Sequence, residues 1–422
     1  MSRLASAGAN TFRSLRVRNY KLFFFGQLVS VCGTWMQTIA QAWLVLRLSH
    51  DSGVAVGVVT ALQFTPTLLF GMWGGVIADR FDKRRLLVGT QLAMTAAAAA
   101  LATLTLTGAV QLWHVYALAL VTGLATAVNA PAHQSFVVEM VGPQDVGNAV
   151  GLNSAGFNAG RIVGPALAGL VIVTVGTGWC FAVNAASFVA AIGGLMAMRP
   201  GELWRGAPVA RAKGQVREGF RYVRRTPELR SNVILLTIVG TLAYNFQVVI
   251  PILAKVTFHG SAGTYSAMTV AMGSGSLVGA LLAASRRRPS GELLFGASLA
   301  FGAANCLAAV SPNLVTVLPA LVLLGLCSIT YVSTANTLLQ LRSDAEMRGR
   351  VMAIYALVVI GSTPIGGPLL GWICQQWGAR WGLGLGGLST LAGAVFFGTS
   401  LLRQRRLGGG MDRDLVGEPA AA

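Results

Sequence analysis

The stretch that decides the fold assignment runs from Gly75 to Arg85 and reads GVIADRFDKRR. It places carboxylates and a run of basic side chains between two long apolar stretches, Val54–Ala78 and Leu86–Leu106. Each apolar stretch can cross a bilayer as a helix, because about 20 mostly apolar residues at a rise of about 1.5 Å span the hydrocarbon core. The charged stretch is therefore predicted to be a short loop between two membrane-spanning helices.

The same alternation of apolar runs and polar breaks continues along all 422 residues. The chain is 54% hydrophobic and only 11% charged, which is typical of an integral membrane protein and excludes a soluble or disordered chain. We predict an all-α integral membrane fold with twelve transmembrane helices. The predicted spans are Phe23–Leu46, Val54–Ala78, Leu86–Leu106, Leu112–Val138, Ala149–Val175, Trp179–Met198, Val233–Val256, Met268–Ala284, Leu293–Val310, Leu314–Leu341, Val351–Ile373 and Leu383–Leu402.

The positions of the basic residues predict how the chain is threaded through the membrane. Most of the 32 Lys and Arg residues lie before the first span, in every second loop and after the last span. The alternate loops contain only Arg47, Lys255 and Arg380, and Arg161 lies inside the fifth span. Because Lys and Arg are retained on the cytoplasmic side, both termini are predicted to be cytoplasmic, in the cell membrane. The net charge of +18 then needs no nucleic-acid partner.

The two halves of the chain resemble each other. Residues 86–93 (LLVGTQLA) recur as residues 293–300 (LLFGASLA), and the Gly-Pro pair at 164–165 recurs at 367–368. A repeat of about half the chain predicts two pseudo-symmetric six-helix halves with a substrate site between them near the midplane. The predicted divisions are an N-terminal half (1–198), a cytoplasmic linker (199–231), a C-terminal half (232–402) and a disordered cytoplasmic tail (403–422).

The stretch from Gly75 to Arg85 resembles the signature loop of the major facilitator superfamily, a Gly, three residues, Asp-Arg and a basic cluster. The resemblance implies a conformational latch on the cytoplasmic side, in which Gly75 permits close helix approach and Asp79 meets a helix N-terminus. The predicted latch comprises Gly75, Asp79, Arg80, Lys83, Arg84 and Glu139. The family's second Gly is replaced by Asp82, and the second-half loop has no corresponding Asp, so the latch is one-sided. Retention of positive charge on the cytoplasmic side would explain the basic cluster alone, but not Gly75 and Asp79 at this spacing.

Further motifs resemble the bacterial branch of the superfamily that contains the enterobactin exporter and many multidrug efflux proteins. They are QLVS at 27–30, WMQ at 35–37, APAHQ at 130–134, REGFRYV at 217–223, LLQ at 338–340 and RGRVM at 348–352. This resemblance covers both halves and identifies the branch, but these motifs do not specify the substrate. Export of a drug, siderophore or secondary metabolite is the expectation.

The fifth span carries a second family-like motif. Gly156, Gly160 and Gly164 recur at every fourth residue, followed by Pro165 and Gly169. The pattern resembles the superfamily's antiporter motif and implies export against an ion. The alternative is a stripe on which another helix packs closely.

Ionisable groups inside the spans are the candidates for substrate binding or coupling. Arg161 lies in mid-span, where an arginine costs about 2.5–3.5 kcal/mol on insertion scales, so it should face a cavity or a partner. It could bind an anionic substrate group or couple to Glu139, or it could be a gate or a structural arginine bonded to carbonyl groups. No carboxylate lies in mid-membrane, so Glu139 is the nearest candidate proton carrier, with a static salt bridge to the basic loop as its alternative. His133 can titrate near neutral pH or be a hydrogen-bonded interior histidine.

Neutral polar and aromatic residues in the spans predict a mostly apolar cavity with few polar anchors, suited to an amphipathic or aromatic molecule. Interhelical hydrogen bonding is the alternative for each. The predicted cavity or coupling residues are Gln37, Gln41, Asn129, His133, Arg161, Tyr244, Asn245, Gln247, Tyr331, Asn336 and Tyr355.

The linker contains a predicted amphipathic helix, in which Val216, Phe220 and Val223 share one face and several arginines surround it. Such a helix is expected to lie on an anionic inner leaflet, with a regulatory partner site as the alternative. The arginines are Arg217, Arg221, Arg224 and Arg225.

The sequence as a whole predicts a secondary transporter that works by alternating access, as a monomer. It contains no metal-ligand cluster, no phosphate-binding loop and no catalytic constellation, so neither an enzyme nor a cofactor or metal is predicted. The predicted activity is export of a hydrophobic or amphipathic small molecule in exchange for protons. The alternatives are an importer of a small metabolite and, outside this class, a membrane receptor or enzyme.

Overall fold

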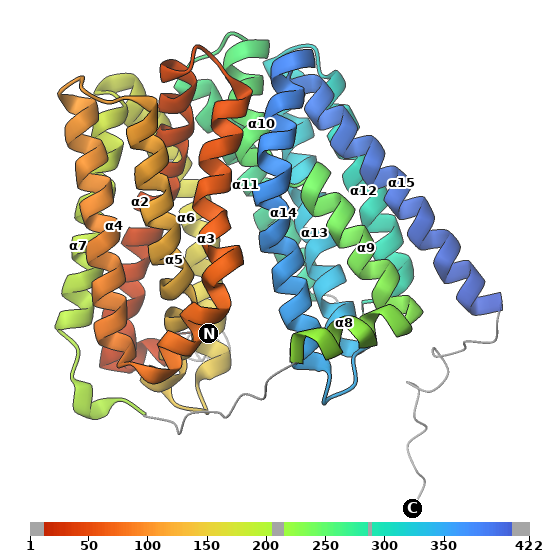
Figure 1. Cartoon of the computed structure of the whole chain (residues 1–422), viewed down its shortest axis with the longest axis horizontal. Helices are drawn as coiled ribbons and strands as arrows, with labels where there is room; N and C mark the ends of the chain where they lie inside the picture. The colour runs from red at the N-terminus through yellow and green to blue at the C-terminus, as the bar shows by residue number, and fades with distance from the viewer. Residues whose placement is uncertain (1–11, 205–214, 286–288, 407–422) are drawn as a thin grey trace, which may run out of the picture.

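The computed structural model describes residues 12–204, 215–285 and 289–406, and this part of the chain is helical without strands. Figure 1 shows long helices running side by side in two groups. The helices are η1 (Arg13–Arg16), α2 (Arg18–Leu48), α3 (Gly53–Arg80), α4 (Lys83–Leu106), α5 (Leu112–Val141), α6 (Val146–Thr174), α7 (Thr177–Met196), η2 (Pro200–Glu202), α8 (Gln215–Arg225), α9 (Pro227–Leu242), α10 (Phe246–Ile252), the π-helix η3 (Leu253–Thr257), α11 (Ala262–Ser285), α12 (Gly291–Val310), α13 (Leu314–Leu341), α14 (Arg348–Trp377) and α15 (Ala379–Arg406).

Twelve of the described helical segments are long and apolar enough to cross a membrane, which confirms the predicted number of spans. Helices α9, α10 and η3 together form the seventh. The observed helices extend beyond several predicted spans: α11 begins at Ala262 and not at Met268, and α15 continues past Leu402 to Arg406. Apolar runs underestimate helix length because helices continue with polar residues beyond the hydrocarbon core. Residues 407–422 of the predicted tail lie outside the described residues.

The seventh span is broken, whereas the sequence predicted one continuous helix. Helix α9 ends at Leu242 and α10 begins at Phe246. The side chain of Asn245 donates hydrogen bonds to the carbonyl oxygens of Gly240 (3.1 Å) and Thr241 (2.9 Å). Such side chains compete with the backbone for hydrogen bonds, and they satisfy carbonyl groups that a helix end leaves without partners. The break therefore follows from Asn245, which a hydropathy pattern does not register.

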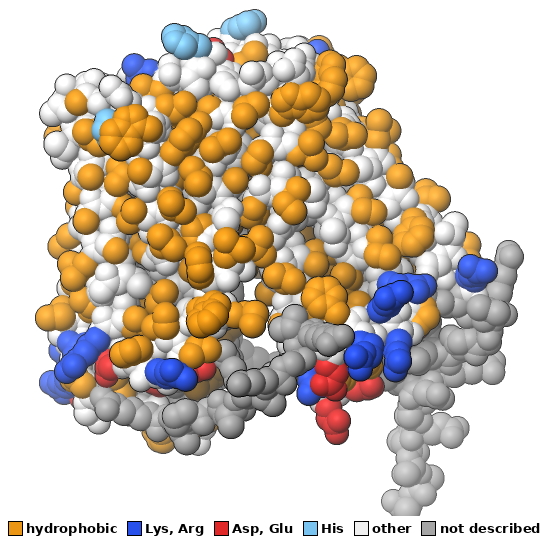
Figure 2. Space-filling model, in the orientation of Figure 1, with side chains coloured by type: hydrophobic (Ala, Val, Ile, Leu, Met, Phe, Trp, Pro, Cys, Tyr) orange, Lys and Arg blue, Asp and Glu red, His pale blue; other side chains and the backbone are white. Residues whose placement is uncertain are grey.

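The helices form an N-terminal half (α2–α7) and a C-terminal half (α8–α15) that meet along two seams, α3 with α14 and α6 with α11. We call the end that carries residues 81–82, 142–145 and 342–347 the basic face, and the other end the far face. In Figure 1 the halves are close together at the far face, at the top, and further apart towards the basic face. In Figure 2 the Lys and Arg side chains gather at the basic face, and apolar side chains cover the middle of the molecule.

The predicted amphipathic helix of the linker is α8, and it packs against α14 and α9 at the basic face (Figure 1). Its side chains hold it there through an ion pair from Glu218 to Arg350 (2.6 Å) and a hydrogen bond from Tyr222 to Asp344 (3.0 Å). Burial raises the pKa of the Tyr222 hydroxyl further above neutral pH, where a tyrosine is protonated and can donate in any case. Val223 is buried whereas Phe220 is exposed.

The linker agrees with the predicted one in its exposed arginines and differs from it in the residue at which it ends. The α8 arginines Arg221, Arg224 and Arg225 are exposed, whereas the side chains of Val216 and Arg217 lie outside the described residues. Helix α9 already begins at Pro227, so the C-terminal half starts before the predicted boundary at residue 232. The predicted helix therefore exists, and part of its apolar face is covered by protein.

Candidate functional site

The predicted latch loop is a tight connection between α3 and α4. Asp82 accepts a hydrogen bond from the backbone nitrogen of Arg85 (2.9 Å) and caps the N-terminus of α4. Its φ of −59° is an ordinary value for any residue, so the turn does not need the glycine found in the related family motif. Gly75 is buried, and at its neighbour Gly74 a Cβ would meet the Ala127 carbonyl group, so α3 and α5 approach closely at this point.

The charged latch residues contact other parts of the N-terminal half. Lys83 forms an ion pair with Glu139 across 2.5 Å, and both side chains are mostly buried. Arg84 donates to the carbonyl oxygens of Leu195 (2.7 Å) and Met196 (3.0 Å), where it meets the negative end of α7. Asp79 and Arg80 lie exposed at the end of α3. In this conformation Lys83 and Arg84 of the predicted latch thus connect α4 to α5 and α7.

A second polar cluster joins the two halves at the far face, and we call it the far-face clamp: Trp43, Asp51, Ser52, Lys255 and Gln375. Lys255 of the C-terminal half forms an ion pair with Asp51 of the N-terminal half (2.5 Å), and its ammonium group lies 5.5 Å from the centre of the Trp43 ring. The side-chain oxygen of Gln375 accepts hydrogen bonds from Ser52 Oγ (2.7 Å) and from the backbone nitrogen of Val54 (3.2 Å).

The sequence interpretation used Lys255 only as a marker of topology and missed this clamp. The sequence contained an indication of this ion pair. Asp51 is the sole Asp or Glu before Asp79, and Lys255 is the sole Lys or Arg between Arg230 and Arg286. Two isolated opposite charges in loops of one face are candidates for a pair. Asp51 also has a left-handed φ of 66°, a conformation that few residues other than glycine adopt, as does the preceding His50 (51°).

Glycines close the α3–α14 seam near the clamp. A Cβ at Gly53 would meet the carbonyl group of Gly371, and one at Gly57 would lie 2.5 Å from the carbonyl oxygen of Gly367. Two helix backbones can approach this closely only where neither carries a side chain. The far-face end of the interface is therefore tightly packed.

The glycine stripe of the fifth span, α6, packs mainly within its own half. A Cβ at Gly160 would lie 2.6 Å from the Val31 side chain, and one at Gly164 would lie 2.6 Å from the Cys32 carbonyl oxygen, both on α2. Gly156 faces the same helix. The packing interpretation accounts for this stripe, and the ion-exchange interpretation stays a prediction.

The end of the same motif reaches the other half. A Cβ at Gly169 would lie 2.6 Å from the Ser266 Cβ on α11, across the second seam. Pro165 is buried inside α6. The motif therefore supports both the internal packing of the N-terminal half and its contact with the C-terminal half.

In this conformation Glu139 is paired with Lys83, and Arg161 makes no ion pair with it. The predicted coupling of Arg161 to Glu139 stays a prediction. The Arg161 guanidinium carbon lies 5.9 Å from the centre of the Trp35 ring on α2. Trp35 in turn packs edge-on against Phe157, with ring centres 5.9 Å apart. Arg161 thus sits beside two aromatic rings on the α2–α6 surface.

Three predicted cavity residues of the N-terminal half make interhelical hydrogen bonds, which favours the structural alternative for them. The bonds run from Asn184 Nδ2 to Gln37 Oε1 (2.7 Å), from Gln63 Nε2 to Gln41 Oε1 (3.2 Å) and from Asn129 Nδ2 to Thr90 Oγ1 (2.8 Å). His133 packs against the Phe23 ring at 4.8 Å between ring centres, and it makes no hydrogen bond with the described residues.

The predicted aromatic residues of the C-terminal half come together at the break in the seventh span. Phe301 stacks on Tyr331 (5.9 Å between ring centres) and lies 6.1 Å from Tyr244. Tyr331 is fully buried, and its hydroxyl has no hydrogen-bond partner among the described residues. Tyr244 and Tyr355 are half-buried and close enough to Tyr331 for electrostatic interaction. The structure therefore brings these three tyrosines into one cluster.

The other predicted residues of the C-terminal half are not part of that cluster. Asn245 caps the end of α9, as described above. Asn336 accepts a hydrogen bond from Gln340 (2.8 Å) near the basic-face end of α13. Gln247 is half-buried on α10. Asn245 and Asn336 thus have partners within the protein.

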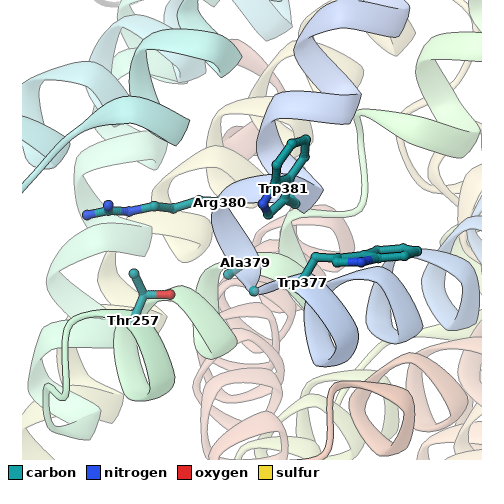
Figure 3. A pocket seen from close by; sticks show the side chains of 6 residues that line it. Thr257, Trp377, Ala379, Arg380 and Trp381 are labelled. Carbon is teal, nitrogen blue, oxygen red and sulfur yellow. The ribbon is translucent and has the colours of Figure 1, made fainter.

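Two hollows lie on the outer parts of the molecule, each lined by one half only. The first, about 330 Å³, is a far-face pocket beside Thr257, Trp377 and Arg380 (Figure 3). Arg380 there donates to the carbonyl oxygen of Ser311 (3.0 Å), so its role is structural. The second, about 510 Å³, is an apolar groove on α3, α4 and α5 with Arg85 among its lining residues. Within the described residues no His, Cys, Asp and Glu cluster suits a metal ion.

Comparison with known proteins places the chain among transporters. The family described as transmembrane secretion effector matches residues 9–408. The staphyloferrin A transporter of Staphylococcus aureus is 24% identical over 386 residues, covering 89% of this chain and 95% of the relative. The multidrug efflux pump Tap of Mycolicibacterium fortuitum is 26% identical over 365 residues, covering 82% and 88%. Macrolide efflux protein A of Streptococcus pyogenes is 25% identical over 284 residues, covering 63% and 67%.

Solved structures share the fold at low sequence identity. A bacterial homologue of the human lysosomal transporter Spinster, in an inward-facing and unoccupied conformation, has a TM-score of 0.67 at 17% identity and covers 91% of this chain and 95% of its own. A mutant of the nucleoside transporter NupG has a TM-score of 0.75 at 11% identity, covering 90% and 99%. The predicted major facilitator fold is confirmed.

Proposed function

The chain belongs to the transmembrane secretion effector family, and on that premise we propose that it exports a hydrophobic or amphipathic small molecule by alternating access. Its relatives and fold are those of a membrane transporter and not of an enzyme. The observation that carries the proposal is the asymmetry of the interface, which is closed by glycines and the clamp at the far face. The proposed substrate is a drug, a siderophore or a secondary metabolite.

In alternating access, the interface between the halves would open at the far face and close at the basic face. Opening the far face requires Lys255 to leave Asp51 and the α3–α14 backbones to separate. Closing the basic face would bring Asp79, at the end of α3, towards the N-terminus of α14 at Arg348, since α3 and α14 share a seam. A carboxylate at a helix N-terminus is favoured by the helix dipole, by about 0.3–1 kcal/mol when exposed. The latch would thus replace the clamp as the contact between the halves.

The basic face is proposed to be cytoplasmic, with both termini on that side of the cell membrane. The gathering of Lys and Arg at that end supports this orientation (Figure 2). The exposed arginines of α8 would then lie beside the anionic inner leaflet, and the protein is proposed to act as a monomer.

Proton exchange is the proposed energy source. The mostly buried pair Lys83–Glu139 is the proposed site, because protonation of Glu139 would release Lys83 and loosen α4 from α5. His133, half-buried against Phe23, is the second candidate. An importer with the same fold remains the alternative direction.

The test is accumulation of a panel of dyes, antibiotics and siderophores in cells that express the wild type, Asp79→Asn or no transporter. Export predicts lower accumulation that requires Asp79 and that a protonophore reverses. Higher accumulation in wild-type cells would instead establish import. Reduced accumulation that persists with the protonophore would contradict proton coupling while leaving export intact.

A further inference from the structure

Arg161 lies in the middle of α6, and no acidic group of the described residues forms an ion pair with it. Within the described residues its guanidinium group makes no hydrogen bond and no ion pair, and its contact is the Trp35 ring. The side chain is half-buried, so it is neither packed into a helix interface nor fully exposed. An arginine has five N–H donors and stays charged at any physiological pH. Its donors at this position therefore have no acceptor from the protein.

The other charges near the membrane interior differ from Arg161 in this respect. Lys83 is paired with Glu139, and Lys255 is paired with Asp51. Every acidic residue of the described chain lies in a loop, in α8 or η2, or close to the end of a spanning helix. None of these described acidic residues forms an ion pair with Arg161 in this structure.

The surroundings of Arg161 fit an aromatic anion. Phe157 lies one turn away on α6 and is 51% exposed, and its ring packs edge-on against Trp35. A guanidinium group can bind a carboxylate through two parallel hydrogen bonds while its face stays on an aromatic ring. The rings would contact the apolar part of the same molecule. Gly273 of α11 packs beside Arg161 and Ile162, so the site borders the seam between the halves.

We propose that Arg161, with Trp35 and Phe157, binds an anionic group of the transported molecule, so that the substrate is an amphipathic anion bearing a carboxylate or a chemically similar acid. This inference rests on the proposed transport function and narrows its substrate class. The bound anion supplies the charge that the protein lacks in mid-membrane. Neutral analogues of the same shape leave the arginine without a counter-charge and bind more weakly.

The test uses aromatic probes that differ only in the acid group: 1-pyrenebutyrate with its methyl ester, and dansylglycine with its methyl ester. Binding to the purified full-length protein is measured through the increase of Tm with probe concentration. The wild type is expected to bind each acid at least about tenfold more tightly than its ester, a difference of about 1.4 kcal/mol. Arg161→Gln is expected to abolish the preference, so that acid and ester bind with about equal affinity, and Arg161→Lys to keep part of it. Arg47→Gln, an exposed arginine on α2, is the matched control and keeps the preference.

Several results would overturn the inference. Equal binding of acids and esters by the wild type, no binding of either acid, or a preference that survives in Arg161→Gln would each do so. If Arg161 were instead a gating residue, Arg161→Gln would alter transport without altering the acid-to-ester ratio. Transport is scored separately in the accumulation assay. Active export without acid preference rejects the anion site alone, whereas acid preference without any transport rejects the proposed function alone.

Discussion

The far face and the basic face of this protein hold their charges in different ways. At the far face the ion pair joins the halves, Asp51 with Lys255, beside the glycine contacts of α3 with α14. At the basic face Lys83–Glu139 lies within the N-terminal half, and Glu218–Arg350 lies within the C-terminal half. The difference teaches that contacts between the halves close one end, while these two ion pairs at the other end each stabilise one half.

The two helices with glycine motifs show the same division. Gly160 and Gly164 of α6 pack against α2 of the same half, whereas Gly367 and Gly371 of α14 pack against α3 of the opposite half. Similar motifs therefore serve different interfaces. Gly160 and Gly164 hold the N-terminal half together, while Gly169 of the same motif meets α11 across the second seam. The contacts of α14 with α3 must separate if the far face opens.

The largest expected effect comes from Gly57→Leu, which places a side chain where the Gly367 carbonyl oxygen now lies. Overpacking of this kind costs about 1–3 kcal/mol, so the closed far face should be lost and transport should fall more than tenfold. The opening is measured as the distance between spin labels at Arg47 and Trp377, exposed on opposite halves. Gly89→Leu is the matched control, because a Cβ there meets no atom within 4 Å. An unchanged label distance in Gly57→Leu would show that the α3–α14 seam accommodates the leucine side chain and that the far face stays closed.

The next largest effect is expected for Asp79→Asn, which removes the charge proposed to meet α14 when the basic face closes. Transport should fall about tenfold or more while the far-face label distance of the resting protein stays that of the wild type. Asp82→Asn is the control, since asparagine also caps a helix and α4 should keep its N-terminus. Equal losses in the two variants would argue for a general effect of charge in the loop and against a latch.

A moderate effect is expected for Lys255→Gln, which removes the far-face ion pair and the contact with Trp43. The pair is partly exposed, so its loss should cost about 1 kcal/mol and shift the population towards an open far face by roughly fivefold. The spin-label distances measure this shift. Exchanging the charges, with Asp51→Lys and Lys255→Asp together, should restore part of the closed population, and failure to do so would indicate that the ion pair is incidental.

The smallest effect is expected for Asp82→Ala, which removes the cap from the N-terminus of α4. Loss of such a cap costs about 1 kcal/mol, so Tm should fall modestly while transport is retained. Thermal unfolding of the purified protein measures the change. A loss of transport as large as that of Asp79→Asn would assign Asp82 to the latch and not to the helix cap.

Sequence reasoning predicted the architecture well and the contacts poorly. The twelve spans were found because apolar runs report a local preference for the bilayer. The break at Asn245 was missed because it depends on a side chain that bonds to its own backbone. A salt bridge from Glu139 to the basic loop was among the alternatives, and the structure shows that its partner is Lys83, whereas coupling of Arg161 to Glu139 stays a prediction. Each such contact depends on helix rotation, which hydropathy does not define.

The amino-acid sequence alone therefore determined the number of spans, the position of the charged loops and the presence of glycine stripes. These are local properties, since each follows from the transfer of a segment between water and hydrocarbon or from the absence of a side chain. Only the tertiary structure decided that Lys255 reaches Asp51, that the α14 stripe faces the other half, and that Arg161 has no partner among the described residues. These contacts join residues far apart in the chain, and they exist only when both halves are folded and placed against each other.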